Sequence, residues 1–175
     1  MKKLLPYFFV LGIISCTNAK QSHNSEIAAK KGAPIYLEED LPFIRKADSI
    51  CRTIDHESIF EHTKDGIVTD RDGQKYPVQY RGYSKTSSDS VDKFLANVLF
   101  GGKNSGKTTC YYYNGGVIKA ISEIFADDIV KTAFYYDGDK MVYPRDAGME
   151  DRWEQTAGNV RDQCISWKTF FLPNK

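Results

Sequence analysis

Residues Gly101 to Thr108 have the most specific catalytic spacing in this sequence, because they satisfy GxxxxGK[ST], the pattern of a phosphate-binding loop. In such a loop, backbone N–H groups and the lysine bind phosphate, provided that a strand precedes the loop and a helix follows it. Here the preceding segment has a helical pattern, and Thr109 to Tyr113 has the pattern of a strand. The sequence therefore predicts a polar connector at this position and no nucleotide site.

His56 and His62 flank a segment rich in carboxylates, and both side-chain types bind zinc. The metalloprotease patterns HExxH and HxxEH nevertheless fail here, because Phe60 and Ser58 occupy the positions of the required histidines. The spacing also directs the two histidines to different faces of a helix. We therefore expect no metal ion and no other cofactor.

Nucleophilic catalysis has no recognisable signature, since GxSxG is absent and only two histidines lie outside the N-terminal region. Two acidic pairs, Asp127-Asp128 and Asp137-Asp139, could perform acid–base chemistry as glycosidases do with two carboxylates. Placement in turns is the simpler interpretation of both pairs. We therefore expect no catalytic residues, and a hydrolase that uses carboxylates stays open as an alternative.

The N-terminal residues have the features of an export signal. Lys2 and Lys3 precede an apolar stretch, Leu4 to Ile14, which is too short to span a bilayer as a stable helix. The stretch ends in Ile13-Ile14-Ser15-Cys16, which resembles the lipobox of bacterial lipoproteins. The resemblance implies cleavage before Cys16 and lipid on that cysteine, and two or more acyl chains would anchor the protein firmly to a membrane.

This interpretation divides the chain into a signal peptide at 1–15, a lipidated flexible tether at 16–35 and a single domain at 36–175. The tether is rich in small and polar residues and lacks the apolar content of a packed core. Thr17 follows the cysteine, and by resemblance to the enterobacterial sorting rule this favours the outer membrane, facing the periplasm. A plain secretory signal with an incidental cysteine is the alternative.

Charge and composition limit the partners of the mature chain. Removing Lys2 and Lys3 from 24 basic residues leaves 22, against 23 acidic ones. The chain therefore lacks the basic excess of a nucleic-acid-binding protein. Its hydrophobic share of 41% and aromatic share of 13% suffice for the core of one domain.

Three cysteines remain once Cys16 is assigned to lipid: Cys51, Cys110 and Cys164. An odd number permits at most one intramolecular disulfide in an oxidising compartment, and the pairing stays open. No CxxC pair occurs, so the cysteines do not indicate a zinc site.

Two segments have helical periodicity. Asp40 precedes Leu41-Pro42 as a helix cap would, and four apolar residues then recur at spacings of three and four: Ile44, Ala47, Cys51 and Ile54. The second candidate runs from Asp89 to Phe100 and is ended by two glycines. Its apolar stripe would be Val91, Phe94, Leu95, Val98 and Leu99.

The other segments predict strands joined by short turns. Asp72-Gly73 separates Ile67–Thr69 from Tyr76–Tyr80, and Pro77 favours an edge position for the latter strand. The dipeptide Asn114-Gly115 favours a hairpin between Thr108–Tyr113 and Val117–Phe125. A similar unit follows, with Phe134–Gly138 before Lys140–Tyr143. We therefore expect an α+β fold, with one or two N-terminal helices packed on an antiparallel meander sheet.

Tyr111–Gly115 and Phe134–Gly138 share an aromatic-Tyr-Tyr-Asn/Asp-Gly unit. The two copies resemble the hairpin repeats of MORN-like and antitoxin-type proteins, and they are similar to small uncharacterised lipoproteins of Bacteroidetes. The resemblance implies a twisted antiparallel sheet and carries no established activity.

Strand alternation places aromatic side chains of both units on both faces of the sheet. One face can pack on the first helix, and the other is either covered by the C-terminal segment or open to a ligand. Alternation in the C-terminal segment indicates such cover, through Ile165, Trp167 and Phe171. The candidate ligand-binding aromatics are Tyr111, Tyr113, Tyr135 and Tyr136.

These observations favour a non-enzymatic binding or interaction module in the cell envelope, held at a membrane through Cys16 and acting on an envelope protein or a glycan. The alternatives are the hydrolase and a structural or inhibitor-type partner protein. A deep cleft with convergent titratable groups would favour the enzyme, and a flat aromatic patch would favour ligand binding. A long unpaired edge strand would favour a protein partner.

Overall fold

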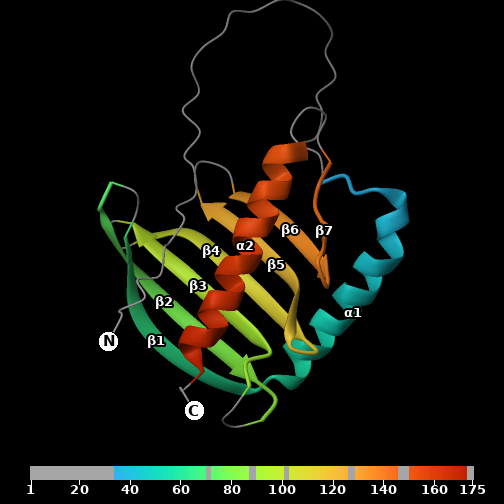
Figure 1. Cartoon of the computed structure of the whole chain (residues 1–175). Coiled ribbons are helices and arrows are strands. Elements are labelled where there is room, and N and C mark those ends of the chain that lie inside the picture. The colour runs from blue at the N-terminus through green and yellow to red at the C-terminus, as the bar shows by residue number, and fades with distance from the viewer. Residues whose placement is uncertain are drawn as a thin grey trace, which may run out of the picture.

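The computed structural model describes residues 34–69, 72–86, 90–100, 103–125, 129–145 and 150–172. They form three layers, with one antiparallel sheet between helix α1, Leu41–Glu57, and helix α2, Glu150–Phe171 (Figure 1). The predicted α+β class with an antiparallel meander is therefore confirmed. The predicted signal peptide, Cys16 and all but the last two residues of the predicted tether lie outside the described residues.

The sheet contains seven strands that pair in the order of the chain, from β1 to β7. The Asn114-Gly115 hairpin forms as predicted, with positive φ angles of 49° and 84° at the two turn residues. The strands are β1 Phe60–Thr69, β2 Lys75–Ser84, β3 Lys93–Phe100, β4 Lys103–Tyr113, β5 Gly116–Phe125, β6 Ile129–Asp137 and β7 Lys140–Val142.

The prediction of a second helix at Asp89–Phe100 was wrong, because Lys93–Phe100 form the interior strand β3. Both faces of β3 pack against other residues, so apolar side chains occur almost continuously along it. Such a run satisfies the helical stripe and the strand pattern equally well. In the structure Phe94 and Ala96 contribute to the core on the α2 side, as alternation along a strand requires.

The edge position predicted from Pro77 was also wrong. The strand that contains it, β2, lies between β1 and β3. Pro77 pairs with Ile67 of β1, whereas the pairing of β2 with β3 begins one residue later, at Val78. The proline, which has no N–H to donate, thus sits outside the segment that pairs on both sides.

Helix α1 buries the stripe that the periodicity predicts, namely Ile44, Ala47, Cys51 and Ile54. These residues pack on Tyr111, Ile118, Tyr135 and Val142 of the sheet. Asp40 occupies the predicted cap position, but its side chain accepts no hydrogen bond from the helix N-terminus. Its buried carboxylate accepts instead from Lys140 Nζ of β7, at 2.7 Å.

Helix α2 covers the opposite face, so the C-terminal segment does provide the predicted cover, but as a helix and not through an alternating strand. Ala157, Val160, Cys164 and Trp167 are buried against the sheet, whereas Ile165 is half exposed. A disulfide between Cys164 and Cys110 of β4 ties the helix to the sheet and settles the pairing, with Cys51 unpaired. No helix in the described part of the chain is both long and apolar enough to cross a membrane.

Candidate functional site

The four candidate aromatics do not form a common surface. Tyr111, Tyr135 and Tyr136 are buried, and Tyr113 alone among them is exposed, at 47%. The predicted alternation is confirmed, because Tyr111 and Tyr135 lie in the core on the α1 side while Tyr136 lies on the α2 side. The two helices therefore enclose three of the four aromatics between layers.

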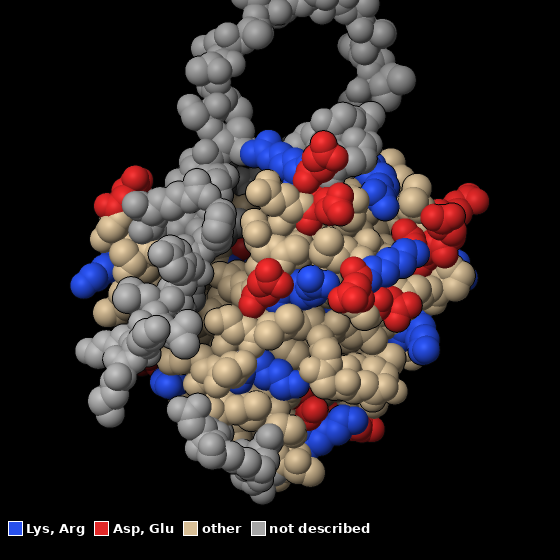
Figure 2. Space-filling model, in the orientation of Figure 1, with Lys and Arg blue, Asp and Glu red and all other residues tan. Residues whose placement is uncertain are grey.

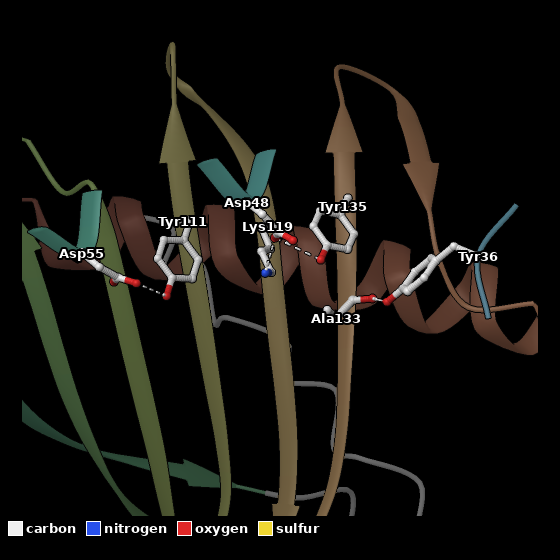
Figure 3. Close-up of polar contacts among 7 residues, drawn as sticks. All are labelled: Tyr36, Asp48, Asp55, Tyr111, Lys119, Ala133 and Tyr135. Atoms are coloured by element: carbon white, nitrogen blue, oxygen red, sulfur yellow. Dashed lines mark hydrogen bonds and ion pairs between the residues drawn. The ribbon is translucent and has the colours of Figure 1, made fainter. Parts of the chain in front are cut away.

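The tyrosine hydroxyls on the α1 side all find acceptors (Figure 3). Tyr111 donates to Asp55 at 3.2 Å and Tyr135 donates to Asp48 at 3.1 Å, so two sheet tyrosines bond to carboxylates of α1. Burial and then the nearby carboxylate raise the pKa of each of these two tyrosines. Both hydroxyls thus stay protonated at neutral pH and act as hydrogen-bond donors.

Three lysines complete this polar layer. Asp40, Asp48 and Asp55 recur at intervals of eight and seven residues, which places them along one side of the N-terminal helical segment. They pair with lysines of alternate strands, at 2.7 Å to Lys140 of β7, 2.6 Å to Lys119 of β5 and 2.6 Å to Lys93 of β3. Each of these three carboxylates thus pairs with a lysine of the sheet, and the three ion pairs hold α1 in place against the sheet.

Cys51 is a free thiol inside this layer. Burial raises its pKa to about 12, despite the opposing charge of Lys119. The reactive form of a cysteine is the thiolate, so a buried thiol with this pKa is a poor nucleophile. Cys51 therefore acts as an apolar side chain of the core.

The face under α2 is closed in a similar way. The hydroxyls of Tyr112 and Tyr136 donate to the backbone carbonyls of Cys164 and Ala157, at 2.7 and 2.9 Å. The indole ring of Trp167 stacks on Phe94 with 5.6 Å between the ring centroids. Tyrosines on both sides of the sheet thus fasten the helices.

A hollow of about 200 Å³ lies beside the β4–β5 turn, where Tyr113 is exposed. Ligand pockets usually exceed about 300 Å³. Lys85, a cation in its wall, is paired with Glu57 at 2.5 Å. The described residues also contain no cluster of three or more potential metal ligands. This hollow offers room for a side chain or a few waters, and no convergent catalytic groups.

The polar connector predicted for the segment that matches the phosphate-loop pattern was wrong, because six of its eight residues belong to strand β4. Lys103 to Thr108 begin β4, and the residues before the loop belong to β3, so the helical context predicted upstream was wrong and the strand predicted downstream is confirmed. Gly101 and Gly102 lie outside the described residues. The amine of Lys107, the lysine of the pattern, is 2.7 Å from the Glu123 carboxylate.

The remaining candidate groups are dispersed. Asp137 and Asp139 are exposed at the β6–β7 turn, while Asp127 and Asp128 lie outside the described residues. The two histidines belong to different elements, one to α1 and one to β1. None of these groups forms a constellation with another in the described part of the chain.

Strand β1 is a long, exposed edge of the sheet. It is ten residues long, and among the described residues it pairs with β2 alone. Its residues are almost all exposed, including Phe60 at 40% and Ile67 at 64%. At the other edge, β7 has three residues and pairs with residues 135–137 of β6, so residues 129–134 of β6 pair only with β5 among the described residues. There Ala133 O accepts a hydrogen bond from Tyr36, and the backbone just beyond β7 bonds to Ile35 through the N–H of Arg145.

Sequence reasoning recognised only the last three residues of β1. Glu61-His62-Thr63-Lys64 is polar at every position, and a strand with one buried face would alternate. Charged residues on both faces are a feature of edge strands, and that signal was available.

Figure 2 shows basic and acidic residues interspersed over the described surface around α2, without a field of one sign.

Comparison with known proteins gives no match: no family model, no curated protein and no solved structure is similar to this chain.

Proposed function

We propose that this chain is an envelope-anchored lipoprotein whose domain is a non-enzymatic protein-interaction module, and that it presents the edge of β1 to its partner. The ten-residue edge, paired only with β2 among the described residues, carries the proposal. An unpaired strand edge offers a row of backbone N–H and C=O groups to an extended segment of another protein. Helix α2 occupies one face of the same sheet, and α1 occupies the other face over β4 to β7. The α1 side of β1 and β2 is exposed and adjoins the proposed edge.

Placement in the envelope has two supports. The lipobox at Ile13–Cys16 implies a lipid anchor, and the disulfide between Cys110 and Cys164 is of a kind that persists in oxidising compartments such as the periplasm. Exported proteins rarely meet ATP. The partner is therefore expected among other exported proteins, at the periplasmic side of the outer membrane.

A photo-reactive amino acid at Thr63 tests the role of β1 in living cells. Thr63 is exposed in the middle of the strand, so the probe should capture one discrete partner from the envelope. The matched control carries the probe at Glu154, which is exposed on α2. If β1 has no role in the interaction, the probes at Thr63 and Glu154 should capture the same proteins, or only the probe at Glu154 should capture a partner.

The anchor is tested separately by metabolic labelling with a fatty-acid probe. The wild-type chain should be labelled, and Cys16→Ser should not be, because lipid attachment needs the thiol. Equal labelling of both chains would refute the lipid anchor while leaving the interaction through β1 intact.

A further inference from the structure

The side chains of β1 divide sharply by charge between the two faces of the strand. Lys64 lies with its amine 3.8 Å from the ring centroid of Phe170, and the rings of His62 and Phe171 are 6.4 Å apart, so the even-numbered residues face α2. Successive residues of a strand point to opposite faces. Glu61, Thr63 and Asp65 therefore point to the α1 side.

The α1 side of the edge is acidic. Glu61 is 3.5 Å from Arg81 of β2, which balances its charge. Asp65 stands opposite Gln79, and it is exposed and has no cation beside it among the described residues. A strand added to β1 would place one of its side chains directly across from Asp65, and cross-strand pairs of opposite charge are favourable.

The α2 side of the edge is aromatic. Phe60 is 40% exposed and Phe170, from the end of α2, is 51% exposed. Lys64 places its charge on the face of the Phe170 ring, which satisfies the amine without a carboxylate. Side chains of an added strand on this side would gain most by being apolar.

A second copy of the chain fits this edge poorly. A sheet continued across two copies requires a twofold axis perpendicular to it, so facing residues must point to the same side. The two registers with the greatest overlap then place Lys64 opposite Lys64 or Asp65 opposite Asp65. Like charges directly opposite each other destabilise such a pair. The centre of β1 thus opposes self-association and leaves the edge for a different chain.

We infer that the occupant of β1 is an extended protein segment in which apolar residues alternate with lysine or arginine. Its basic residues face Asp65 and Glu61, and its apolar residues pack beside Phe60 and Phe170. This inference rests on the proposed function, because it assigns a partner class to the same edge. The net charge of the whole chain is only +1, so attraction to a basic segment would have to come from this local arrangement.

Two labelled ten-residue peptides test the inference with the purified full chain in non-ionic detergent. One alternates lysine with valine and the other alternates glutamate with valine, and fluorescence anisotropy measures both affinities. The lysine peptide should bind the wild type about fivefold tighter than the glutamate peptide, the upper range of one cross-strand charge pair. Asp65→Lys should reverse that order, and Asp139→Lys, in the β6–β7 turn, should not. Unchanged melting curves of both variants would show that the fold is retained.

The outcomes separate this inference from the proposed function. Equal binding of both peptides to the wild type would overturn the basic preference and leave the edge as a binding site. If neither peptide binds and the Thr63 probe captures no partner in cells, the proposed function fails as well. A cross-link from the Thr63 probe to a second copy of the chain, together with a dimer in sedimentation equilibrium, would assign the edge to a second copy and overturn the inference.

Discussion

Removal of the disulfide between Cys110 and Cys164 should destabilise the domain strongly. The bond joins residues 54 positions apart, and it links the central strand β4 to the helix that covers one face of the sheet. In the double variant Cys110→Ala/Cys164→Ala the folded chain keeps most of its apolar contacts. The denatured chain, however, gains the freedom that the cross-link had removed.

The size of this effect follows from the loop length. Closing a loop of 54 residues corresponds to about 4 kcal/mol of unfolding free energy at 25 °C in the chain-entropy model. For a domain of this size such a loss lowers the melting temperature by roughly 10 °C or more. Both cysteines are fully buried, so a reductant gains access to the bond mainly when the protein opens.

Urea unfolding followed by circular dichroism measures the loss. A reductant should shift the wild-type midpoint to that of the double variant and leave the double variant unchanged, which controls for effects of the reductant itself. Alkylation in urea without reductant should label Cys51 and spare Cys110 and Cys164. Equal midpoints for wild type and double variant would refute the reasoning, as would alkylation of Cys110 or Cys164.

Two further predictions concern polar contacts of the sheet. Tyr135→Phe removes the bond to Asp48 and should lower the unfolding free energy by about 1 kcal/mol, whereas Tyr83→Phe, with an exposed 3.4 Å contact to Glu61, should have little effect in the same urea titration. Burial opposes ionisation of Glu123, but Lys107 and Lys131 outweigh it and hold its pKa below the ordinary 4.5. Its contribution is therefore present above pH 4.5 and lost as the pH falls through the folded-state pKa. The stability difference between wild type and Glu123→Gln should shrink as the pH falls from about 6 to about 3, and a constant difference would contradict this.

The elements that sequence predicted correctly are those in which one physical signal acts alone. Helix α1 has a polar side and a single buried stripe, so its period is unambiguous. The β4–β5 turn needs two consecutive residues with positive φ, which Asn-Gly tolerates better than almost any other pair. In both cases local chemistry and the tertiary fold favour the same structure.

The failures occurred where burial on two faces conceals the period. Strand β3 lies in the interior of the sheet, and its apolar residues satisfy a helical stripe because apolar side chains are at least partly buried on both of its faces. In α2 the helical spacing of Ala157, Val160, Cys164 and Trp167 was present, but the aromatic alternation of its last residues favoured a different interpretation. Only the pairing partner or the covering layer distinguishes these cases, and neither is local in sequence.

The aromatic hairpins illustrate why a correct fold does not locate a site. Alternation correctly predicted that tyrosines would lie on both faces, but burial depends on what covers each face. Here a helix covers each face, and the tyrosine hydroxyls bond to α1 carboxylates or to α2 carbonyls. The residues that looked most suitable for a ligand are therefore those that fasten the layers.

The proposed partner site lies at the rim of the sheet. Helix α2 covers one face of the sheet and α1 covers the other over β4 to β7, so the edges, the turns and the α1 side of β1 and β2 are accessible to other molecules. At one edge, the strand β7 has three residues and pairs only with residues 135–137 of β6. The strand at the other edge, β1, has ten residues and bears charges that oppose pairing with itself. Exposed edges that escape self-association commonly do so through such charges, and the same charges select among foreign strands. Asp65→Lys replaces one pair of like charges between two copies by another, so it should reverse the peptide preference of β1 without creating self-association through this edge.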